Sequence, residues 1–143
     1  MRLHYIARGV AVLGESVLLA RDRSASNTFL PGGHIGDGES APVALRREWQ
    51  EELGIDVEDT RFLGAVEHRF DKPDGAAHWE INLVFAVSST DLTPHTPPRS
   101  REAHLEFLWA PVPRLQDFRL LPPPMVPLVL SGVETQAFWG STF

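Results

Sequence analysis

The stretch that decides the fold runs from Gly33 to Ile55 and reads GHIGDGESAPVALRREWQEELGI. It fits the spacing G-x5-E-x7-R-E-U-x-E-E-x-G-U, in which U is a bulky apolar residue. The specified positions are filled by Gly33, Glu39, Arg47, Glu48, Trp49, Glu51, Glu52, Gly54 and Ile55. Its seven fixed identities coincide by chance in roughly one window in 10⁸, because each residue type makes up roughly one residue in 15. The stretch is therefore a motif and not an accident of composition.

The second half of the motif predicts a helix. Ser40 is a favoured N-cap residue, and Pro42 suits the first helical turn. Gly54 suits the position that follows the last turn. The apolar residues that recur at the helical period, and so predict the face turned to the core, are Leu45, Trp49 and Leu53. We therefore expect a helix that begins after Ser40 and ends at Leu53.

Three glutamates of this helix, Glu48, Glu51 and Glu52, stand at positions i, i+3 and i+4, so their carboxylates share one face. Like charges this close repel each other by roughly a few tenths of a kcal/mol per pair, and a hard divalent cation removes that repulsion. Carboxylate ligands without histidine or cysteine suit Mg²⁺ or Mn²⁺ and not zinc. Glu52 lies beside the apolar stripe, so we expect its carboxylate to be partly desolvated. A solvated acidic face is the alternative.

The rest of the motif favours a site over a solvated face. The segment Pro31-Gly32-Gly33 allows a tight turn, in which the backbone approaches a metal or a phosphate closely. Arg47 lies one turn before Glu51 and is placed to orient that carboxylate by a charge-assisted hydrogen bond, although an ordinary exposed pair is the alternative.

The motif resembles the signature of the Nudix hydrolases at every specified position. The resemblance implies an α/β fold, a Nudix-type α/β/α sandwich with a mixed β-sheet, in which the motif helix packs on one side and a C-terminal helix on the other. The chain length suits one domain, residues 1–143. The implied activity is a divalent-metal-dependent pyrophosphohydrolase that cleaves the diphosphate linkage of a nucleotide or nucleoside diphosphate derivative. Water attacks a phosphorus while the metal neutralises the developing charge.

Carried over onto this sequence, the resemblance implies metal ligands at Glu48, Glu51 and Glu52, with Mg²⁺ or Mn²⁺ as the cofactor. It implies catalytic roles for Arg47, Glu51 and Glu52. We expect Glu52 to be the indispensable ligand and Glu51 to be either a second ligand or the general base. Glu39 is expected to support the loop or the start of the helix.

The family often adds an acidic residue from a loop before a late strand. Glu102 is the first candidate for this role and Glu106 the second. A solvated loop or edge charge is an open alternative for both.

Composition excludes several classes of function. The net charge of −6 argues against a nucleic-acid polymer as partner, because neutralising its phosphates needs clustered lysine and arginine. The absence of cysteine excludes disulfides and thiol chemistry. No apolar stretch reaches the length that spans a membrane, so we expect a cytoplasmic protein without membrane contact and with a small nucleotide-type substrate. A homodimer stays an open alternative.

Outside the motif, the pattern predicts further short elements. Strands are expected at residues 3–13, 17–20, 28–30, 61–70, 79–87 and 105–110, and short helices at 112–118 and 124–130. The first two strands would form a hairpin across Gly14 to Ser16, and residues 88–101 a long loop. The tail residues Phe138, Trp139 and Phe143 are too aromatic for a simple disordered end, so we expect them to dock.

The strand at residues 79–87 alternates between two kinds of face. Its apolar face holds Trp79, Ile81, Leu83, Phe85 and Val87. The other face carries His78, Glu80 and Asn82, which together with His68 either line a pocket or face solvent at a sheet edge. Zinc binding through His68 and His78 is disfavoured, because no compact set of four ligands exists.

The positions that bind the substrate are less evident. Arg8 interrupts an apolar strand, and Arg21 and Arg23 follow the next one. Any of them could reach a phosphate, but for each alone we expect an ordinary surface charge.

Other functions compete with nucleotide hydrolysis. Isoprenoid diphosphate isomerisation is disfavoured because related isomerases use a catalytic cysteine, and RNA decapping is disfavoured by the acidic balance. A catalytically weak nucleotide-binding or regulatory module is the main alternative, and the complete motif counts against it. The substrate stays open among nucleoside triphosphates, ADP-ribose, nucleotide sugars and dinucleoside polyphosphates, as do the phosphorus attacked and the number of metal ions.

Overall fold

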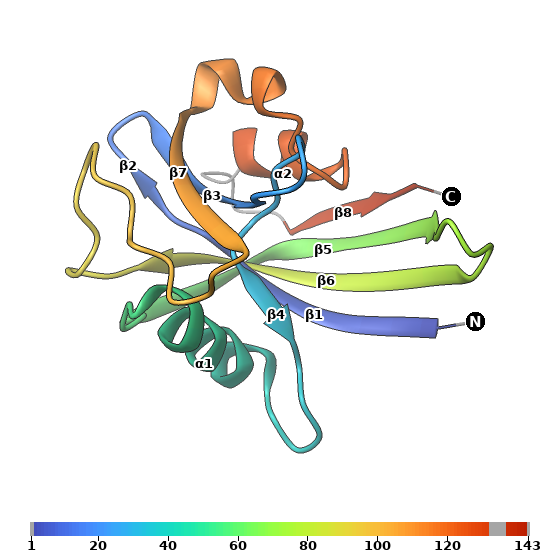
Figure 1. Ribbon diagram of the computed structural model, residues 1–143. Helices are drawn as coiled ribbons and strands as arrows, with labels where there is room; N and C mark the ends of the chain where they lie inside the picture. Colours follow the sequence, from blue (N-terminus) through green and yellow to red (C-terminus); the bar gives the residue numbers. More distant parts are fainter. Residues whose placement is uncertain (1, 132–136, 143) are drawn as a thin grey trace.

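The structure is a computed structural model that describes residues 2–131 and 137–142 (Figure 1). The elements in chain order are β1 (Arg2–Val10), β2 (Val12–Leu13), β3 (Ser16–Asp22), β4 (Gly32–His34), α1 (Ala41–Leu53), β5 (Asp59–Asp71), β6 (Ala77–Ser88), β7 (Leu105–Pro111), the 3₁₀ helix η1 (Val112–Phe118), α2 (Met125–Leu130) and β8 (Phe138–Ser141). No helix within the described ranges is long and apolar enough to cross a bilayer.

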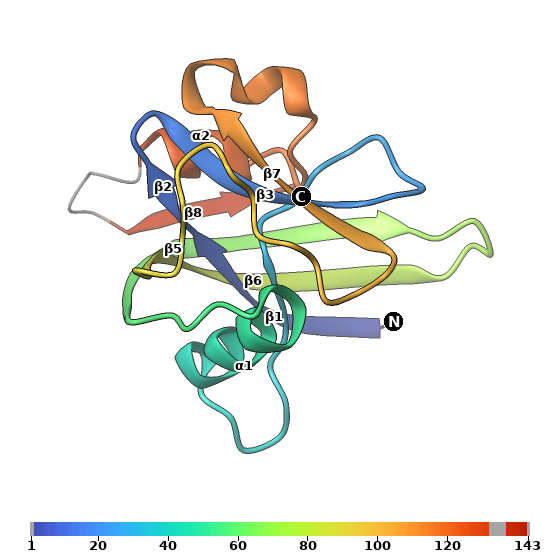
Figure 2. The same ribbon diagram turned by 60° about the vertical axis from the view of Figure 1, so that its left-hand side comes forward.

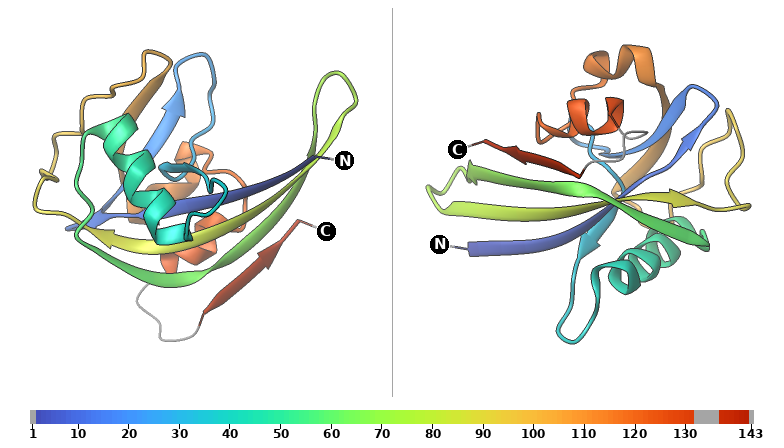
Figure 3. Two further views of the ribbon diagram at one scale, coloured as in Figure 1. Left: turned by 90° about the horizontal axis from the view of Figure 1, so that it is seen from below. Right: turned by 180° about the vertical axis from the view of Figure 1, so that it is seen from behind.

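The strands form two sheets. One has the order β4-β1-β6-β5-β8 and is mixed, because β1 runs parallel to β6 and β5 parallel to β8 while its other pairs are antiparallel. The other has the order β2-β3-β7 and is antiparallel. Helix α1 lies on one side of the five-stranded sheet, and η1 and α2 lie on the other (Figures 1 and 3). The expected α/β/α sandwich with a mixed sheet is confirmed.

Two apolar clusters hold these layers together. The first packs the stripe of α1, in which Trp49 and Leu45 are fully buried, against the sheet residues Ala7 and Phe85. The second packs α2 and η1 against the opposite face of the sheet. Figure 2 shows α1 beneath β1 and the three-stranded sheet above it. Because the stripe of α1 turns to the core, its glutamates are left at the rim of the sheet.

The prediction of a single strand at residues 3–13 is wrong. The prediction that this whole strand forms a hairpin with the next one is therefore also wrong. The chain leaves the five-stranded sheet after Val10 and enters the three-stranded sheet at Val12, so only β2 and β3 form the hairpin. Val10 and Ala11 are both buried, but they belong to different apolar clusters. An unbroken apolar run therefore conceals a change of sheet.

The strand expected at residues 28–30 is also displaced. Thr28 and Phe29 make only isolated bridges, and the regular strand β4 begins at Gly32. Gly32 and Gly33 pair with Arg8 and Ala7 of β1. The glycines that suggested a turn are thus part of an edge strand.

Strand β6 is not a sheet edge, since it lies between β1 and β5. The residues on its polar side include His78, which is 3% exposed, and Asn82, which is 0% exposed. The solvent-facing alternative for this side of the strand is therefore wrong. Its buried polar groups need partners within the fold, and β1 and β5 supply them.

The tail docks as expected, by strand pairing. Phe138 pairs with Gly64 and Trp139 with Ala65 in the parallel register of β8 against β5. Phe143 lies outside the described residues.

Candidate active site

The ends of helix α1 match the motif. The Val43 N–H donates to Ser40 Oγ at 3.4 Å, which caps the first turn. Gly54 adopts a left-handed conformation with φ of 66°, and its N–H donates to the Gln50 carbonyl at 3.1 Å. These caps fix the bounds of the helix and therefore the face on which the three glutamates lie.

Arg47 is the hub of the acidic face. Its Nε and Nη2 donate to the two carboxylate oxygens of Glu39 at 2.6 and 2.9 Å, and its Nη1 donates to Glu48 Oε1 at 2.9 Å. The expected contact with Glu51 is present but longer, at 3.3 Å. Nη2 also donates to the His34 carbonyl at 3.1 Å, which ties the helix to β4. Arg47 therefore orients three carboxylates and one strand end.

Glu39 supports the loop before the helix. Hydrogen bonds lower the pKa of the Glu39 carboxyl to about 2. Those from Arg47 contribute most, and the one from the Gly36 N–H at 2.8 Å contributes next. The same contact, with a further contribution from Glu48, raises the pKa of Arg47. Glu39 is thus occupied by structural partners, in keeping with a supporting role.

Glu52 differs from its neighbours because it is partly buried and incompletely paired. Its Oε2 is buried and has no hydrogen-bond partner within the described residues. Burial, and after it the charge of Glu48, raise the pKa of the Glu52 carboxyl to about 7, against the opposing effect of Arg8. Glu102 and Glu51 add smaller upward contributions. An unpaired buried carboxylate oxygen among other carboxylates is a group that a cation would stabilise.

The acidic face of α1 offers oxygen donors to a divalent cation, but they do not yet surround one point. In the described part of the chain, no three acidic or histidine side chains converge on a common point. Glu48 and Glu51 lie against Arg47, whereas Glu52 keeps a free oxygen. The carboxylate oxygens therefore suit Mg²⁺ or Mn²⁺ in chemistry, and a shared site requires these side chains to move closer to one another.

The backbone of Gly33 comes against the Glu48 carboxylate. A Cβ atom added at Gly33 would lie 2.7 Å from Glu48 Oε1 and would overlap the rest of the carboxylate. Only glycine leaves space for this approach, which explains the first position of the motif.

Arg8 is not the surface charge that the sequence suggested. Its Nη1 donates to the carbonyls of Leu30 and Gly32 at 3.1 and 3.3 Å, and its Nε donates to Asn82 Oδ1 at 3.4 Å. Its guanidinium carbon lies 5.4 Å from the centre of the Phe29 ring. Burial lowers the pKa of Arg8, and the carboxylates of Glu80, Glu52 and Glu48 counteract that effect. In the sequence, the sign that Arg8 has partners within the fold is its position as a lone charged residue inside an apolar strand.

The two outer acidic candidates differ in their surroundings. Glu106 faces Arg21 across the β3–β7 pair and forms ion pairs with Arg21 at 2.6 Å and Arg23 at 3.5 Å. Glu102 lies close enough to Glu52 to raise its pKa. The Arg101 N–H donates to the Glu52 carbonyl at 2.7 Å, which brings this loop to the end of the helix. The geometry favours Glu102 over Glu106.

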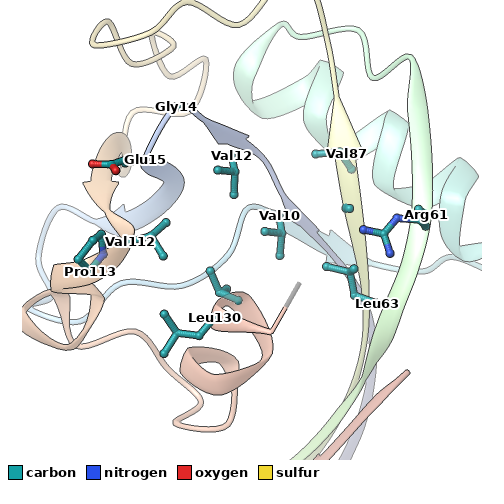
Figure 4. A pocket seen from close by; sticks show the side chains of 12 residues that line it. Val10, Val12, Gly14, Glu15, Arg61, Leu63, Val87, Val112, Pro113 and Leu130 are labelled. Atoms are coloured by element: carbon teal, nitrogen blue, oxygen red, sulfur yellow. The ribbon is translucent and has the colours of Figure 1, made fainter. Parts of the chain in front are cut away.

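A cavity of about 510 Å³ lies elsewhere (Figure 4). Its walls are largely apolar and include Val10, Leu63, Val112 and Leu130, with Arg61 and Glu15 as the charged residues. None of the motif glutamates lines it. The candidate site is therefore the acidic face of α1, which lies outside this cavity.

Comparisons with known proteins agree with this geometry. The NUDIX domain family model matches residues 3–129. The 8-oxo-dGTP diphosphatase of Proteus vulgaris is 50% identical over 40 residues, which cover 28% of this chain and 36% of that protein. The match thus spans about a third of that relative's length.

Solved structures share the fold over nearly the whole chain. The MutT NUDIX hydrolase from Burkholderia pseudomallei is 25% identical with a TM-score of 0.67, over 94% of this chain and 100% of that one. The mutator MutT protein from Bacillus halodurans has a TM-score of 0.73 at 15% identity, over 96% and 88% of the two chains, and shows the fold alone. Since the family model covers most of the sequence, the chain belongs to the Nudix family.

Proposed function

We propose that this protein is a pyrophosphohydrolase that needs Mg²⁺ or Mn²⁺ and cleaves the diphosphate linkage of a nucleotide or nucleoside diphosphate derivative. The observation that carries the proposal is the face of α1 with Glu48, Glu51 and Glu52, on which Glu52 keeps a buried unpaired oxygen. A free carboxylate oxygen at this depth only costs stability unless a cation binds there. The whole of residues 1–143 is proposed to act as one domain.

The residues of the site have different roles. Glu52, with Glu48 and Glu51, holds the cation, which when bound neutralises phosphate charge and acidifies a water molecule. Arg47 keeps Glu48 and Glu51 on the correct side of the helix through its hydrogen bonds. The side chain of Glu51 is 55% exposed and makes the longest contact with Arg47, so it is the freest to turn, as a second ligand or as the general base.

The substrate is proposed to lie on the polar side of β6, next to the carboxylates. Arg8 is held there by three acceptors and carries a positive charge within range of Glu48 and Glu52. A small nucleotide suits this position, since Arg8 contributes a positive charge on this side of the sheet of an overall acidic chain. The name of the Proteus vulgaris relative makes 8-oxo-dGTP the first compound to try.

A substrate screen tests the proposal directly. The purified chain would be incubated with Mg²⁺ and with 8-oxo-dGTP, dGTP, ADP-ribose, a nucleotide sugar and a dinucleoside polyphosphate. Hydrolysis in ¹⁸O-labelled water would show which phosphorus is attacked. We expect turnover of at least one compound and its loss on chelation. Full turnover after exhaustive chelation would overturn the role of the metal.

Metal binding by itself gives a second test, which does not depend on the substrate. A cation that binds only the folded state adds about 1.4 kcal/mol of stability at tenfold excess over its Kd. Mg²⁺ should therefore raise the Tm of the wild type, whereas a variant with Gln in place of Glu48, Glu51 and Glu52 should respond little. Binding without turnover of any compound would favour the regulatory module.

A further inference from the structure

Three histidine side chains form a row across three strands of the five-stranded sheet. His4 of β1 lies in the middle: its Nδ1 is 2.8 Å from His34 Nε2, and its Nε2 is 2.7 Å from His78 Nδ1. His34 is the last residue of β4, and His78 lies near the start of β6. We call this row the histidine chain. It joins residues that are 30 and 74 positions apart.

The rings are arranged as a hydrogen-bonded chain and not as a metal site. Both nitrogens of His4 already face another imidazole, and no set of three such donors in the described ranges surrounds one point. Each contact between two ring nitrogens needs one proton, donated by one ring and accepted by the other. The chain stays intact when it carries one extra proton, because a protonated His4 donates to both neighbours. A second extra proton puts a charge on a ring that should accept, and one contact must break.

Few other groups compete for these rings. Phe70 of β5 stacks on His78 and His4, with centroid distances of 5.2 and 6.4 Å. The charged residues that act on His4 are Glu80 of β6, which favours protonation, and Arg2 of β1, which opposes it together with His34 and His78. His78 is buried and His34 is exposed, so the chain runs from the interior of the sheet to its edge.

The outer end of the chain is attached to the acidic face. Strand β4 has only three residues and pairs with β1 alone, so its hold on the sheet is short. The His34 carbonyl accepts a hydrogen bond from Arg47 Nη2 at 3.1 Å, and the preceding Gly33 lies against the Glu48 carboxylate. Movement of His34 therefore changes the positions of the groups that hold Glu48 and Glu51.

We propose that His4 is a positioning residue for the carboxylates of α1: by tying His34 to His78, it fixes the edge strand against which Arg47 and Glu48 are held. This inference rests on the proposed function, because it gives His4 a task in arranging the proposed metal ligands. Backbone bonds from Gly9 to Pro31 and from Ile35 to Tyr5 keep β4 in the sheet, so loss of the histidine chain loosens the end of the strand without releasing it.

Binding of Mn²⁺ alone, measured by calorimetry, tests the proposal. His4→Ala removes both contacts, and we expect Mn²⁺ affinity at pH 7.5 to fall by about tenfold, as is typical when a partner that orients metal ligands is lost. Added imidazole should restore part of that affinity by filling the gap. His34→Ala cuts a single contact at an exposed side chain, so it tests the same link if His4→Ala does not fold. The matched control is His68→Ala. His68 lies on the same side of the sheet and stacks on Phe70, but it has no hydrogen bond to the histidine chain.

The pH profile separates positioning from a general loss of structure. A second extra proton on the histidine chain breaks one of its contacts, so the ratio of wild-type to His4→Ala affinity should fall towards one as the pH is lowered. A ratio that stays constant with pH would overturn the proposal, and so would an effect of His68→Ala as large as that of His4→Ala. NMR spectra of the ring nitrogens in the apo protein should show that His4→Ala shifts the signals of both His34 and His78; unchanged signals would also overturn it.

The inference and the proposed function fail in different ways. If Glu52→Gln binds Mn²⁺ as tightly as the wild type does, the cation lies elsewhere and the proposed function is wrong. If Glu52→Gln loses binding while His4→Ala and His34→Ala retain it, the metal site stands and the role of His4 is wrong.

Discussion

Helix α1 and strand β6 each carry polar residues at a regular spacing, but they differ in how those residues are satisfied. On α1, Glu52 keeps a buried oxygen without a partner in the described residues. On β6, Asn82 is fully buried, yet its amide donates to the Val66 carbonyl and to Glu80, and its carbonyl oxygen accepts from Arg8. A helix face brings its own residues together, whereas a strand face depends on the neighbours that the sheet supplies. The unsatisfied group is the place at which we propose that the cation binds.

The largest effect is expected when the unsatisfied charge of Glu52 is removed. Glu52→Gln should lower kcat by about 100-fold, because losing a metal ligand removes roughly 3 kcal/mol of transition-state stabilisation. The apo protein should melt at the same temperature or higher, since a repelled charge is gone. Steady-state kinetics and thermal melts measure both, with the exposed Glu58→Gln as control. Near-normal turnover would show that the open oxygen of α1 is not a ligand.

The corresponding substitution on β6, Asn82→Leu, should lower the free energy of unfolding. Asn82→Leu leaves the Arg8 Nε and the Glu80 carboxylate without their shared partner, which should cost about 2 kcal/mol. Urea denaturation measures the free energy of unfolding, and Mn²⁺ binding should persist. If the leucine variant proved as stable as the wild type, the polar groups of β6 would not be the satisfied network described here.

The pH dependence of stability sharpens the same contrast. The pKa of Glu52 in the folded state is about 7, above its usual value of 4.5, so the folded state binds the extra proton. The stability this contributes is fully present below pH 4.5 and is lost as pH rises through 7. The effect is moderate, because Glu52 is only partly buried and water screens its charge. Melting curves of the apo protein should therefore decline over this range in the wild type more steeply than in Glu52→Gln, and parallel curves would contradict the shift.

The smallest effect concerns the start of α1. Ser40→Ala removes the hydrogen bond from the Val43 N–H, which at 3.4 Å is long, so the cost should be about 0.5 kcal/mol. Chemical denaturation of Ser40→Ala and Ser40→Asp would measure it, and the aspartate should keep the cap. A loss of several kcal/mol would mean that the placement of the acidic face depends on its cap far more than the geometry indicates.

The helix could be predicted from the sequence because its information is local. Ser40 and Gly54 stand at its ends, and the spacing of the three glutamates converts directly into a shared face. The strands at 61–70 and 79–87 were also predicted to within two residues at each end, and the second alternates regularly between apolar and polar residues. The roles given to Arg47, Glu48, Glu51 and Glu52 stay predictions, because nothing yet tests them.

The remaining features depend on pairing between distant segments. The sequence alone predicts a surface charge at Arg8, because its acceptors come from Leu30, Gly32 and Asn82, which only the sheet brings close. The histidine chain was not anticipated for the same reason. The change of sheet at Ala11 leaves no mark in the local pattern, because both flanking residues are apolar.

The parallel pairing of β8 with β5 also has a consequence for how the molecule is made. During synthesis β5 leaves the ribosome long before β8, so one side of β5 has no partner while the middle of the chain is being translated. An unpaired strand side is a template on which a second nascent chain can add. In Figure 1, β8 runs along the outside of β5 and covers this side. Once β8 has docked, we expect this side of β5 to be closed to a second copy of the chain, in addition to Phe138 packing against the second apolar cluster.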